Sequence, residues 1–349
     1  MSKEEKVKTE NVVSDTKSVS VNSNIKTVTP NVLLGIDIGN AYCKTSSGIR
    51  FLSRVSSAYG KSYTNNAHNL EWNNEKYLVG DIDGMTFTKS DKYTTNEYKA
   101  TLLTAILLSV KDMDNDNINI YLSLGTPVEQ YDECKEICRQ TAIELGTQTI
   151  TVDKITKTIN IKDAIVVPQS AIIGDKNVED LPSLVIDFGG GTLDVSVWDI
   201  DDNGVPYKTY AKSMPEYSFD IIIEKFRNKI RTAYSSEISY TDAISLLDNP
   251  IKTSKVSGEI NYSAEVDSIL SDYAKMIYST LKQNNLPTLL NTVYCIGGCG
   301  NLMKPYIEKA FGFVENSITS DKEPQFSNVV SYYEVGKYYY TARGINGIK

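Results

Sequence analysis

Asp187 ends a short apolar run, residues 184–186, and is followed within two positions by consecutive glycines. These are Gly189, Gly190 and Gly191, with Thr192 next, after which alternating β-branched residues resume. The order predicts a strand, a tight turn and a second strand. Glycine has no Cβ and tolerates positive φ, so a bound anion can approach the backbone N–H groups of such a turn, and the Thr192 hydroxyl lies at the same rim.

The carboxylate before this turn indicates a metal ion rather than a direct contact with phosphate. A carboxylate and a phosphate repel each other, so Asp187 is best explained as a partner for a cation that neutralises the phosphate. Taken alone, the segment is also compatible with a plain hairpin that has a glycine turn. The two interpretations remain open at this point.

A weaker form of the same pattern lies about 150 residues earlier. Asp37 ends the apolar run 32–36, Gly39 and Asn40 follow, and a second short strand leads to Lys44. Two related halves that face one another would explain the repeat. Such an arrangement would hold a polyphosphate and its metal from two sides of one cleft.

A third glycine turn follows the apolar strand 291–296. Gly297, Gly298 and Gly300 precede apolar residues at helical spacing, so strand, turn and helix are expected here. A turn of bare backbone offers a flat surface to an adenine or a ribose. It is equally suited to close packing of a strand against a helix.

Composition excludes several classes of function. The 349 residues carry a net charge of −8, which argues against a general grip on nucleic acid, and no apolar run is long enough to span a membrane or to act as a secretory signal. We therefore expect a cytoplasmic protein. The chain has five cysteines and one histidine, His68, so we expect neither a zinc site nor a histidine-containing triad. We expect the cysteines to be buried, reduced thiols.

The surrounding elements follow from periodicity and turn signals. Helices are expected at 96–113, 128–145, 219–234, 264–284 and 325–340. The first of these has one apolar face, and Ser218 could cap the third. Strands are expected at 118–124, 155–161 and 164–171. Residues 201–204 read as a hairpin turn. Residues 1–30 read as a disordered tail, and residues from about 55 to 95 as a small inserted subdomain.

The three glycine motifs, in this order along the chain, resemble the motifs of a known superfamily. The segments around Asp37, Asp187 and Gly297 are similar to the phosphate-1, phosphate-2 and adenosine motifs of the actin, Hsp70 and sugar-kinase superfamily, over residues 31–345. Within it, residues 166–171 and 326–336 resemble the linker and closing helix of the bacterial plasmid-segregating actins, the ParM family and its relatives.

The resemblance implies an α/β actin-like ATPase fold, with two domains of duplicated RNase H-like topology around a nucleotide cleft. Domain I would comprise residues 31–170 and 325–349, and domain II residues 171–324. Asp37 and Asp187 would hold Mg²⁺ mostly through water. The remaining site residues would contact ATP or GTP. The phosphates would meet Gly39, Asn40, Lys44 and Gly189 to Thr192. The nucleoside would meet Gly297, Gly298 and Gly300.

Gln169 departs from part of this pattern. The ParM family is similar here but carries a glutamate, whereas eukaryotic actin has a glutamine. A neutral amide can orient the attacking water but cannot take its proton, so Gln169, with Asp37 and Asp187, would support slow hydrolysis. Alternatively, Gln169 only bonds the backbone beside Pro168.

The function implied is a nucleotide-dependent filament that segregates plasmid or phage DNA. ATP or GTP would close the domains, closed protomers would associate head to tail, and slow hydrolysis would weaken that contact. A DNA-bound adaptor protein is the expected partner, with no direct nucleic-acid or membrane contact. A small-molecule kinase is the alternative, but it needs a carboxylate base where Gln169 stands. An Hsp70-like engine would need a substrate domain, and an RNase H-like nuclease would leave the glycine turns unexplained.

Overall fold

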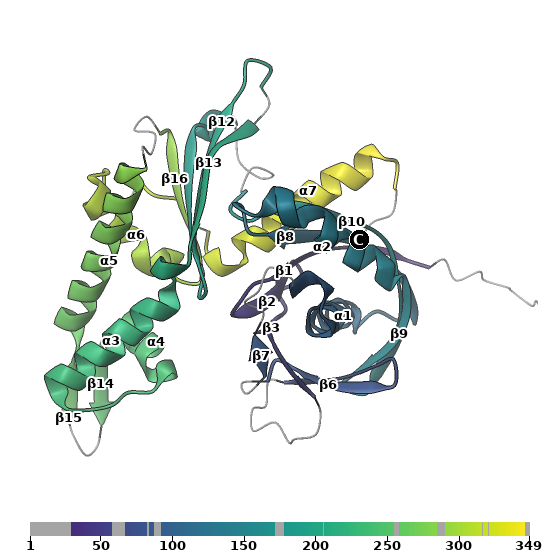
Figure 1. The fold of residues 1–349 in the computed structure, drawn as a ribbon, viewed down its shortest axis with the longest axis horizontal. Helices are drawn as coiled ribbons and strands as arrows, with labels where there is room; N and C mark the ends of the chain where they lie inside the picture. Colours follow the sequence, from purple (N-terminus) through teal and green to yellow (C-terminus); the bar gives the residue numbers. More distant parts are fainter. Residues whose placement is uncertain are drawn as a thin grey trace, which may run out of the picture.

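The computed structural model describes residues 29–345 apart from residues 58–66, 82–83, 87–91, 172–177, 205, 255–257, 285–289, 316 and 320. The expected disordered tail lies outside this part of the chain except for its last two residues. The described residues form two large sheets, each with its own helices, and a separate two-stranded hairpin (Figure 1). We call the ten-stranded sheet with α1, α2 and α7 the first half, and the four-stranded sheet with its helices the second half.

The first half is built on one ten-stranded sheet. Its strands are β1 (Asn31–Ile38), β2 (Tyr42–Thr45), β3 (Arg50–Leu52), β4 (Arg54–Ser57), β5 (His68–Trp72), β6 (Glu75–Val79), β7 (Met85–Thr86), β8 (Asn117–Thr126), β9 (Thr147–Val152) and β10 (Ile155–Pro168). Their order is β3-β2-β1-β8-β10-β9-β5-β6-β4-β7, with β8 parallel to both β1 and β10. Strands β5 to β7, from the expected inserted subdomain, therefore continue this sheet through β9. The domain limits themselves stay a prediction.

Helix α1 (Asn96–Val110) lies inside the curl of this sheet (Figure 1). The sequence predicts one apolar face, and Leu102 and Leu103 are buried as expected. Thr101 and Thr104 on the other side are buried as well, because strands surround the helix. The expectation of a single buried face is therefore wrong. The helix begins at a Thr95 cap, whose hydroxyl accepts the Tyr98 N–H.

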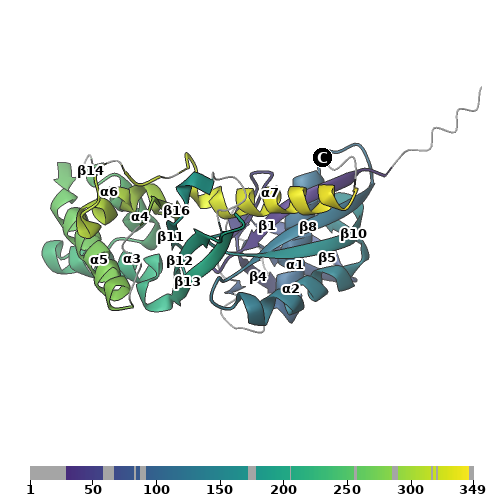
Figure 2. The ribbon, with the colours of Figure 1, turned by 90° about the horizontal axis from the view of Figure 1, so that it is seen from above.

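Two helices cover the outer face of the sheet. Helix α2 (Tyr131–Leu145) packs on β8 and β10 and begins three residues later than predicted, and α7 (Ser327–Ala342) runs along β1 and β8 (Figure 2). The predicted strands 155–161 and 164–171 are one strand, β10, with a bulge between Ile161 and Asp163.

The second half repeats the central topology of the first. Its strands are β11 (Ser183–Phe188), β12 (Leu193–Ile200), β13 (Pro206–Met214) and β16 (Thr292–Gly297), in the order β13-β12-β11-β16. β11 pairs antiparallel with β12 and parallel with β16, as β1 does with β2 and β8. The expectation of two related halves is thus confirmed. Residues 201–204 form the turn between β12 and β13, as predicted.

Helices cover one face of this second sheet. They are α3 (Phe219–Tyr234), α4 (Tyr240–Asp248), α5 (Ser263–Gln283) and α6 (Gly300–Phe311), beside a small hairpin of β14 (Ile251–Ser254) and β15 (Gly258–Asn261). Ser218 occupies the position before α3 but makes no side-chain cap bond. The Phe219 N–H instead donates to Gly189 O at 3.1 Å, so the glycine turn satisfies the start of this helix.

The two halves meet over a third apolar cluster. Its members come from β10, the segment just after it, the second sheet and α7: Val167, Ala171, Val185, Trp198, Tyr294, Ile296, Val329 and Tyr332. The chain crosses between the halves twice, after β10 and before α7. Both crossings pass this cluster, so the carboxyl ends of β1 and β11 come close together.

The cysteines are reduced and mostly buried, as predicted, and the single histidine lies at the surface. Four cysteines are buried and Cys299 is partly exposed, and all five are free thiols. The single histidine, His68, places Nδ1 2.6 Å from Asp153 Oδ2 at the surface. Within the described ranges, every helix is too short or too polar to cross a bilayer.

Candidate nucleotide site

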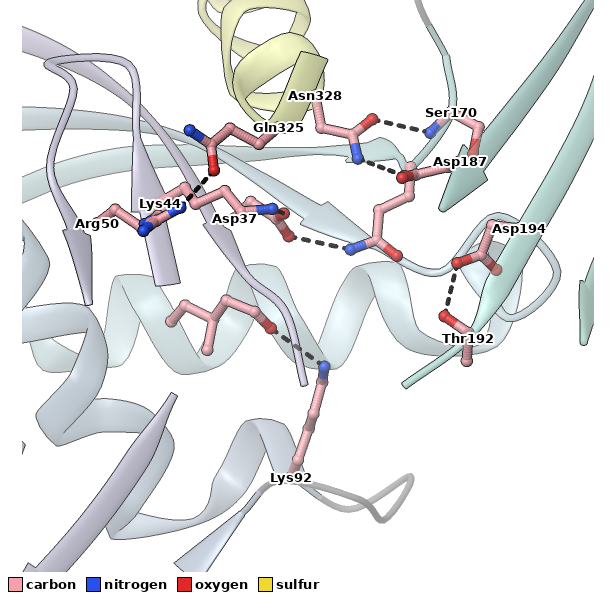
Figure 3. Close-up of polar contacts among 12 residues, drawn as sticks. Asp37, Lys44, Arg50, Lys92, Ser170, Asp187, Thr192, Asp194, Gln325 and Asn328 are labelled. Atoms are coloured by element: carbon pink, nitrogen blue, oxygen red, sulfur yellow. Dashed lines mark hydrogen bonds and ion pairs between the residues drawn. The ribbon is translucent and has the colours of Figure 1, made fainter. Parts of the chain in front are cut away.

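Asp37 lies near the end of β1 and is only 3% exposed. Its Oδ1 accepts a hydrogen bond from Gln169 Nε2 at 3.0 Å, and its Oδ2 lies 3.9 Å from Lys44 Nζ (Figure 3). The backbone N–H of Gln169 donates to Thr126 O at 2.8 Å. The Gln169 side chain thus faces a carboxylate, which favours the site interpretation over a purely backbone role.

Asp187 lies near the end of β11 and is 6% exposed. Its Oδ2 accepts a hydrogen bond from Asn328 Nδ2 at 2.7 Å (Figure 3). Burial, reinforced by the nearby Asp194, raises the pKa of Asp187 to about 7, although Lys44 and Asn328 act in the opposite direction. Ionised Asp187 is therefore destabilised, and a bound cation would relieve that cost.

The two glycine turns face one another across the junction of the halves. A Cβ on Gly191 would lie 2.6 Å from Asn40 Nδ2, and one on Gly190 would lie 3.0 Å from the Cβ of Ala41. A Cβ on Gly189 would meet Thr192 O at 2.7 Å. Only glycine allows this approach, so the turn is more than a generic hairpin.

Thr192 is engaged in a way that the sequence did not predict. Its Oγ1 donates to Asp194 Oδ2 at 2.8 Å, and Ser213 Oγ donates to the other oxygen of the same carboxylate. Burial raises the pKa of Asp194. The Thr192 proton is thus directed at Asp194, so contact with a phosphate as a donor would require this hydroxyl to rotate.

A cavity of about 730 Å³ lies between the two halves. Of the predicted residues, Asn40, Gly191 and Thr192 line it. Asp37, Gln169 and Asp187 do not, and neither do four predicted phosphate contacts: Gly39, Lys44, Gly189 and Gly190. The two carboxylates are too buried to reach its surface. The volume falls within the range of small-molecule sites.

Both walls of the cavity carry charged residues that sequence reasoning missed. The first half contributes Arg54, Lys92 and Glu129, and the second half contributes Asp220 and Glu224 with the neutral Tyr240 beside them. Both cations belong to the first half, which suits a ligand whose anionic end lies on that side. The sequence offers no local signal for this set, because its members come from separate elements.

Lys92 is the most buried of these cations, at 9% exposure. Its Nζ donates to Ile38 O at 3.3 Å, at the end of β1 (Figure 3), and burial lowers the pKa of its ammonium. On the opposite wall, Tyr240 Oη donates to Asp220 Oδ1 at 2.5 Å, and the Asp220 N–H donates to Gly190 O at 3.2 Å. The second contact ties the start of α3 to the glycine turn of residues 189–191.

The third glycine turn serves packing at two of its three positions. Gly297 has φ +82°, and a Cβ there would lie 2.4 Å from Asp187 Oδ1; a Cβ on Gly300 would lie 2.7 Å from Cys295 O. Gly298 has nothing within 4 Å of its Cβ position. The packing interpretation therefore holds for Gly297 and Gly300, and Gly298 alone has open space for a nucleoside. None of the three lines the cavity.

The residues present fit a magnesium nucleotide. Among the described residues, no three or more His, Cys, Asp or Glu side chains are grouped so as to hold a metal on their own. Mg²⁺ does not require such a group, because it keeps several waters and binds one or two carboxylates together with substrate phosphates. Asp37 and Asp187 supply that pair, and Asn40, Gly191 and Thr192, which follow these carboxylates in the chain, line the cavity.

Two family models match adjoining parts of the chain. The model described as "Actin like proteins N terminal domain" matches residues 35–171, and the one described as "Plasmid segregation protein ParM, C-terminal" matches residues 178–335. No curated protein sequence matches the chain.

Solved structures of actin-like proteins share the whole fold. An archaeal actin homolog, Ta0583, is 18% identical, with a TM-score of 0.73 over 88% of this chain and 99% of its own. Its complex with ADP gives a TM-score of 0.69, also at 18% identity, with the same coverage. A 15-stranded ParM filament from Clostridium botulinum gives 0.68 at 18% identity, over 89% of this chain and 100% of its own. At identities this low, the structural similarity establishes the fold alone. The predicted actin-like fold class is confirmed.

Proposed function

The chain is an actin-like protein of the ParM family, and on that premise we propose that it forms nucleotide-dependent filaments that segregate plasmid or phage DNA. One observation carries the nucleotide part of this proposal. Two glycine turns, one from each half, lie against each other: a Cβ on Gly191 would clash with Asn40, and one on Gly190 would be tight against Ala41. A buried carboxylate lies behind each turn. The complex of the archaeal homolog with ADP supports nucleotide as the ligand.

In the proposed complex the first half meets the phosphates through Gly39, Asn40 and Lys44, and the second half through Gly189 to Thr192. Gly297, Gly298 and Gly300 lie toward the nucleoside, with Gly298 the position that has room for it. Asp37 and Asp187 would hold Mg²⁺, mostly through water. When bound, this ion neutralises phosphate charge that the carboxylates would otherwise repel.

Hydrolysis in this proposal depends on Gln169. Its amide, held on Asp37 at 3.0 Å, can orient a water molecule toward the terminal phosphate but cannot accept its proton. Turnover of ATP or GTP is therefore slow, which suits a filament whose nucleotide state acts as a timer. The same neutral amide disfavours a small-molecule kinase, because transfer to a hydroxyl needs a base at this point.

Self-association is the proposed readout of nucleotide state. The similar structures include filaments of ParM and of Alp12, which supports head-to-tail assembly of this chain. With a net charge of −8, direct binding to DNA is disfavoured, so the proposed link to DNA is a DNA-bound adaptor protein in the cytoplasm.

Sedimentation tests this function directly. Purified protein should pellet with Mg²⁺ and ATP or GTP, and should remain in the supernatant with EDTA. Asp187→Ala should not pellet under either condition, because its phosphate-2 wall lacks the carboxylate. If the wild-type protein stays monomeric at tens of micromolar with a non-hydrolysable analogue and Mg²⁺, the filament proposal should be abandoned.

A further inference from the structure

Asn328 lies in the first turn of α7, where the chain returns from the second half to the first. It is 8% exposed, and both ends of its side-chain amide are bonded (Figure 3). Nδ2 donates to Asp187 Oδ2 at 2.7 Å, and Oδ1 accepts the backbone N–H of Ser170 at 3.1 Å. These bonds fix the amide orientation, since a reversed amide would turn its oxygen toward the carboxylate and its NH₂ toward an N–H.

The Ser170 end of this bridge lies directly beside Gln169. Ser170 has φ +64°, in the left-handed region that non-glycine residues rarely adopt. Its carbonyl accepts a hydrogen bond from Ser196 Oγ at 3.1 Å, and the N–H of Gln169 donates to Thr126 O at 2.8 Å. The backbone is therefore held on both sides of Gln169, and its side chain is directed at Asp37.

The helix that carries Asn328 is seated firmly on the first sheet. A Cβ on Gly35 of β1 would lie 2.5 Å from Val329 O, and one on Gly336 would lie 3.1 Å from the Leu33 side chain. A side chain at Gly35 would collide with the backbone of α7, and one at Gly336 would be tight against β1, so these glycines let the helix lie close to the strand. The position of Asn328 is thus set by the first half, whereas its partner Asp187 belongs to the second.

We propose that Asn328 is a positioning residue for hydrolysis, which keeps Asp187 of the second half and Gln169 of the first half in one fixed arrangement. This inference rests on the proposed function. Asn328 does not line the cavity, so it acts through its two partners rather than on the nucleotide. When nucleotide draws the halves together, a shift of Asp187 is passed through the amide to the backbone that carries Gln169.

The first test separates turnover from binding. Asn328→Ala should lower kcat about tenfold while the dissociation constant for ADP changes less than about threefold. The matched control is Ser327→Ala, in the same turn and 3% exposed, whose hydroxyl bonds Asp321 at 2.5 Å instead of the site. The control should keep wild-type kcat. Retained ADP binding in each variant shows that it is folded.

A second variant separates the two ends of the amide. Asn328→Asp keeps an acceptor for the Ser170 N–H but places a carboxylate against Asp187. If the Asp187 bond matters, this variant should lose at least as much kcat as Asn328→Ala. Wild-type turnover in Asn328→Asp would overturn the proposal, because it would reduce Asn328 to a structural bond with the backbone.

A double-mutant cycle tests whether Asn328 acts through Gln169. In a Gln169→Ala background, Asn328→Ala should cause little further loss of kcat, since the group that it positions is gone. The same fold loss in both backgrounds would overturn the proposal. If the wild-type protein neither binds ADP nor hydrolyses ATP, the proposed function falls and this inference with it. If wild-type turnover is present and Asn328→Ala matches Ser327→Ala, only the inference falls.

Discussion

The burial of Asp187 opposes its own ionisation. The side chain is 6% exposed beside Asp194, and its pKa rises from 3.8 to about 7. A protein that kept this carboxylate for stability alone would gain by replacing it with a neutral residue. Its place at the end of β11, opposite Asp37 at the end of β1, is better explained by a cation that the two hold together.

This raised pKa predicts a particular pH dependence of stability without nucleotide or metal. Below pH about 4 the carboxyl is protonated in both states, and between about 4 and 7 only the folded protein keeps the proton, so rising pH favours unfolding. The contribution is therefore present below the unfolded pKa of 3.8 and is lost as pH rises through about 7. Each pH unit in this window costs about 1.4 kcal/mol for one such group.

Urea unfolding in EDTA between pH 5 and pH 8 measures this effect. Asp187→Asn should flatten the fall in unfolding free energy, because the amide does not titrate. Asp202→Asn, in the exposed turn between β12 and β13, is the matched control and should retain the wild-type slope. Equal slopes in the wild-type protein and Asp187→Asn would contradict the assignment.

Gln169 and Asp187 should fail in different ways when they are removed. Gln169→Ala leaves the carboxylate pair in place, so nucleotide should still bind while hydrolysis slows, on the order of a hundredfold for a lost group that orients the nucleophile. Asp187→Ala removes a proposed metal partner and should lose nucleotide binding itself. Equilibrium binding and single-turnover hydrolysis, measured on both variants, distinguish the two losses. Equal effects on both quantities in both variants would contradict this division of roles.

At the level of helices and strands, sequence patterns predicted the elements that depend only on neighbouring residues. The apolar run before Asp187 and the glycines after it are sufficient to predict a strand and a turn, and β11 with its turn follows. The environment of α1 is different, because its buried Thr101 and Thr104 depend on strands far away in the chain that curl around it. The bulge in β10 depends likewise on distant pairing, because β10 pairs with β8 on both sides of it.

The site shows the same division between local and distant determinants. The carboxylates and glycines could be predicted because the same spacing occurs twice in the sequence. Lys92 and Asn328 carry no such spacing, and they reach the site only because η1 (Lys92–Thr94) and α7 pack near the end of β1. A lysine shortly before a helix and an asparagine in the first turn of a helix are both common, so nothing in the sequence distinguishes these two.

The third glycine turn allows a test at the level of one element. Gly297 has positive φ, and an added Cβ would lie 2.4 Å from Asp187 Oδ1 and 2.6 Å from Phe188 O. Gly297→Ala should therefore lower the unfolding free energy by about 1–3 kcal/mol, through strain and overpacking. Gly298→Ala, with open space at its Cβ position, should stay within about 0.5 kcal/mol of wild type in urea unfolding.

The same pair of variants tests the nucleoside assignment. If a nucleoside packs on Gly298, the added methyl group of Gly298→Ala should weaken ADP binding although stability is unchanged. Unchanged ADP affinity would leave Gly298 without a role in binding. Equal destabilisation by both substitutions would contradict the packing described for Gly297.

At the level of the whole molecule, each half has its own hydrophobic core, and the two halves are joined at a junction. The two chain crossings and the third apolar cluster form one side of that junction. On the cavity side the halves touch through polar contacts: Glu129 Oε2 accepts the Ser213 N–H at 2.7 Å, and Lys208 Nζ donates to Val128 O at 3.2 Å. Polar contacts of this kind are easier to break than an apolar core, so opening should occur on the cavity side.

Nucleotide release should therefore depend on these polar contacts. Lys208→Met removes a bond between the halves and keeps the length of the side chain, so ADP should dissociate about two- to tenfold faster, as expected for the loss of one hydrogen bond. Lys212→Met is the matched control, because Lys212 lies on the same strand but bonds Asn284 at 3.4 Å within the second half. Stopped-flow displacement of a fluorescent ADP analogue measures both rates. If the two variants release ADP equally fast, this contact does not restrain opening.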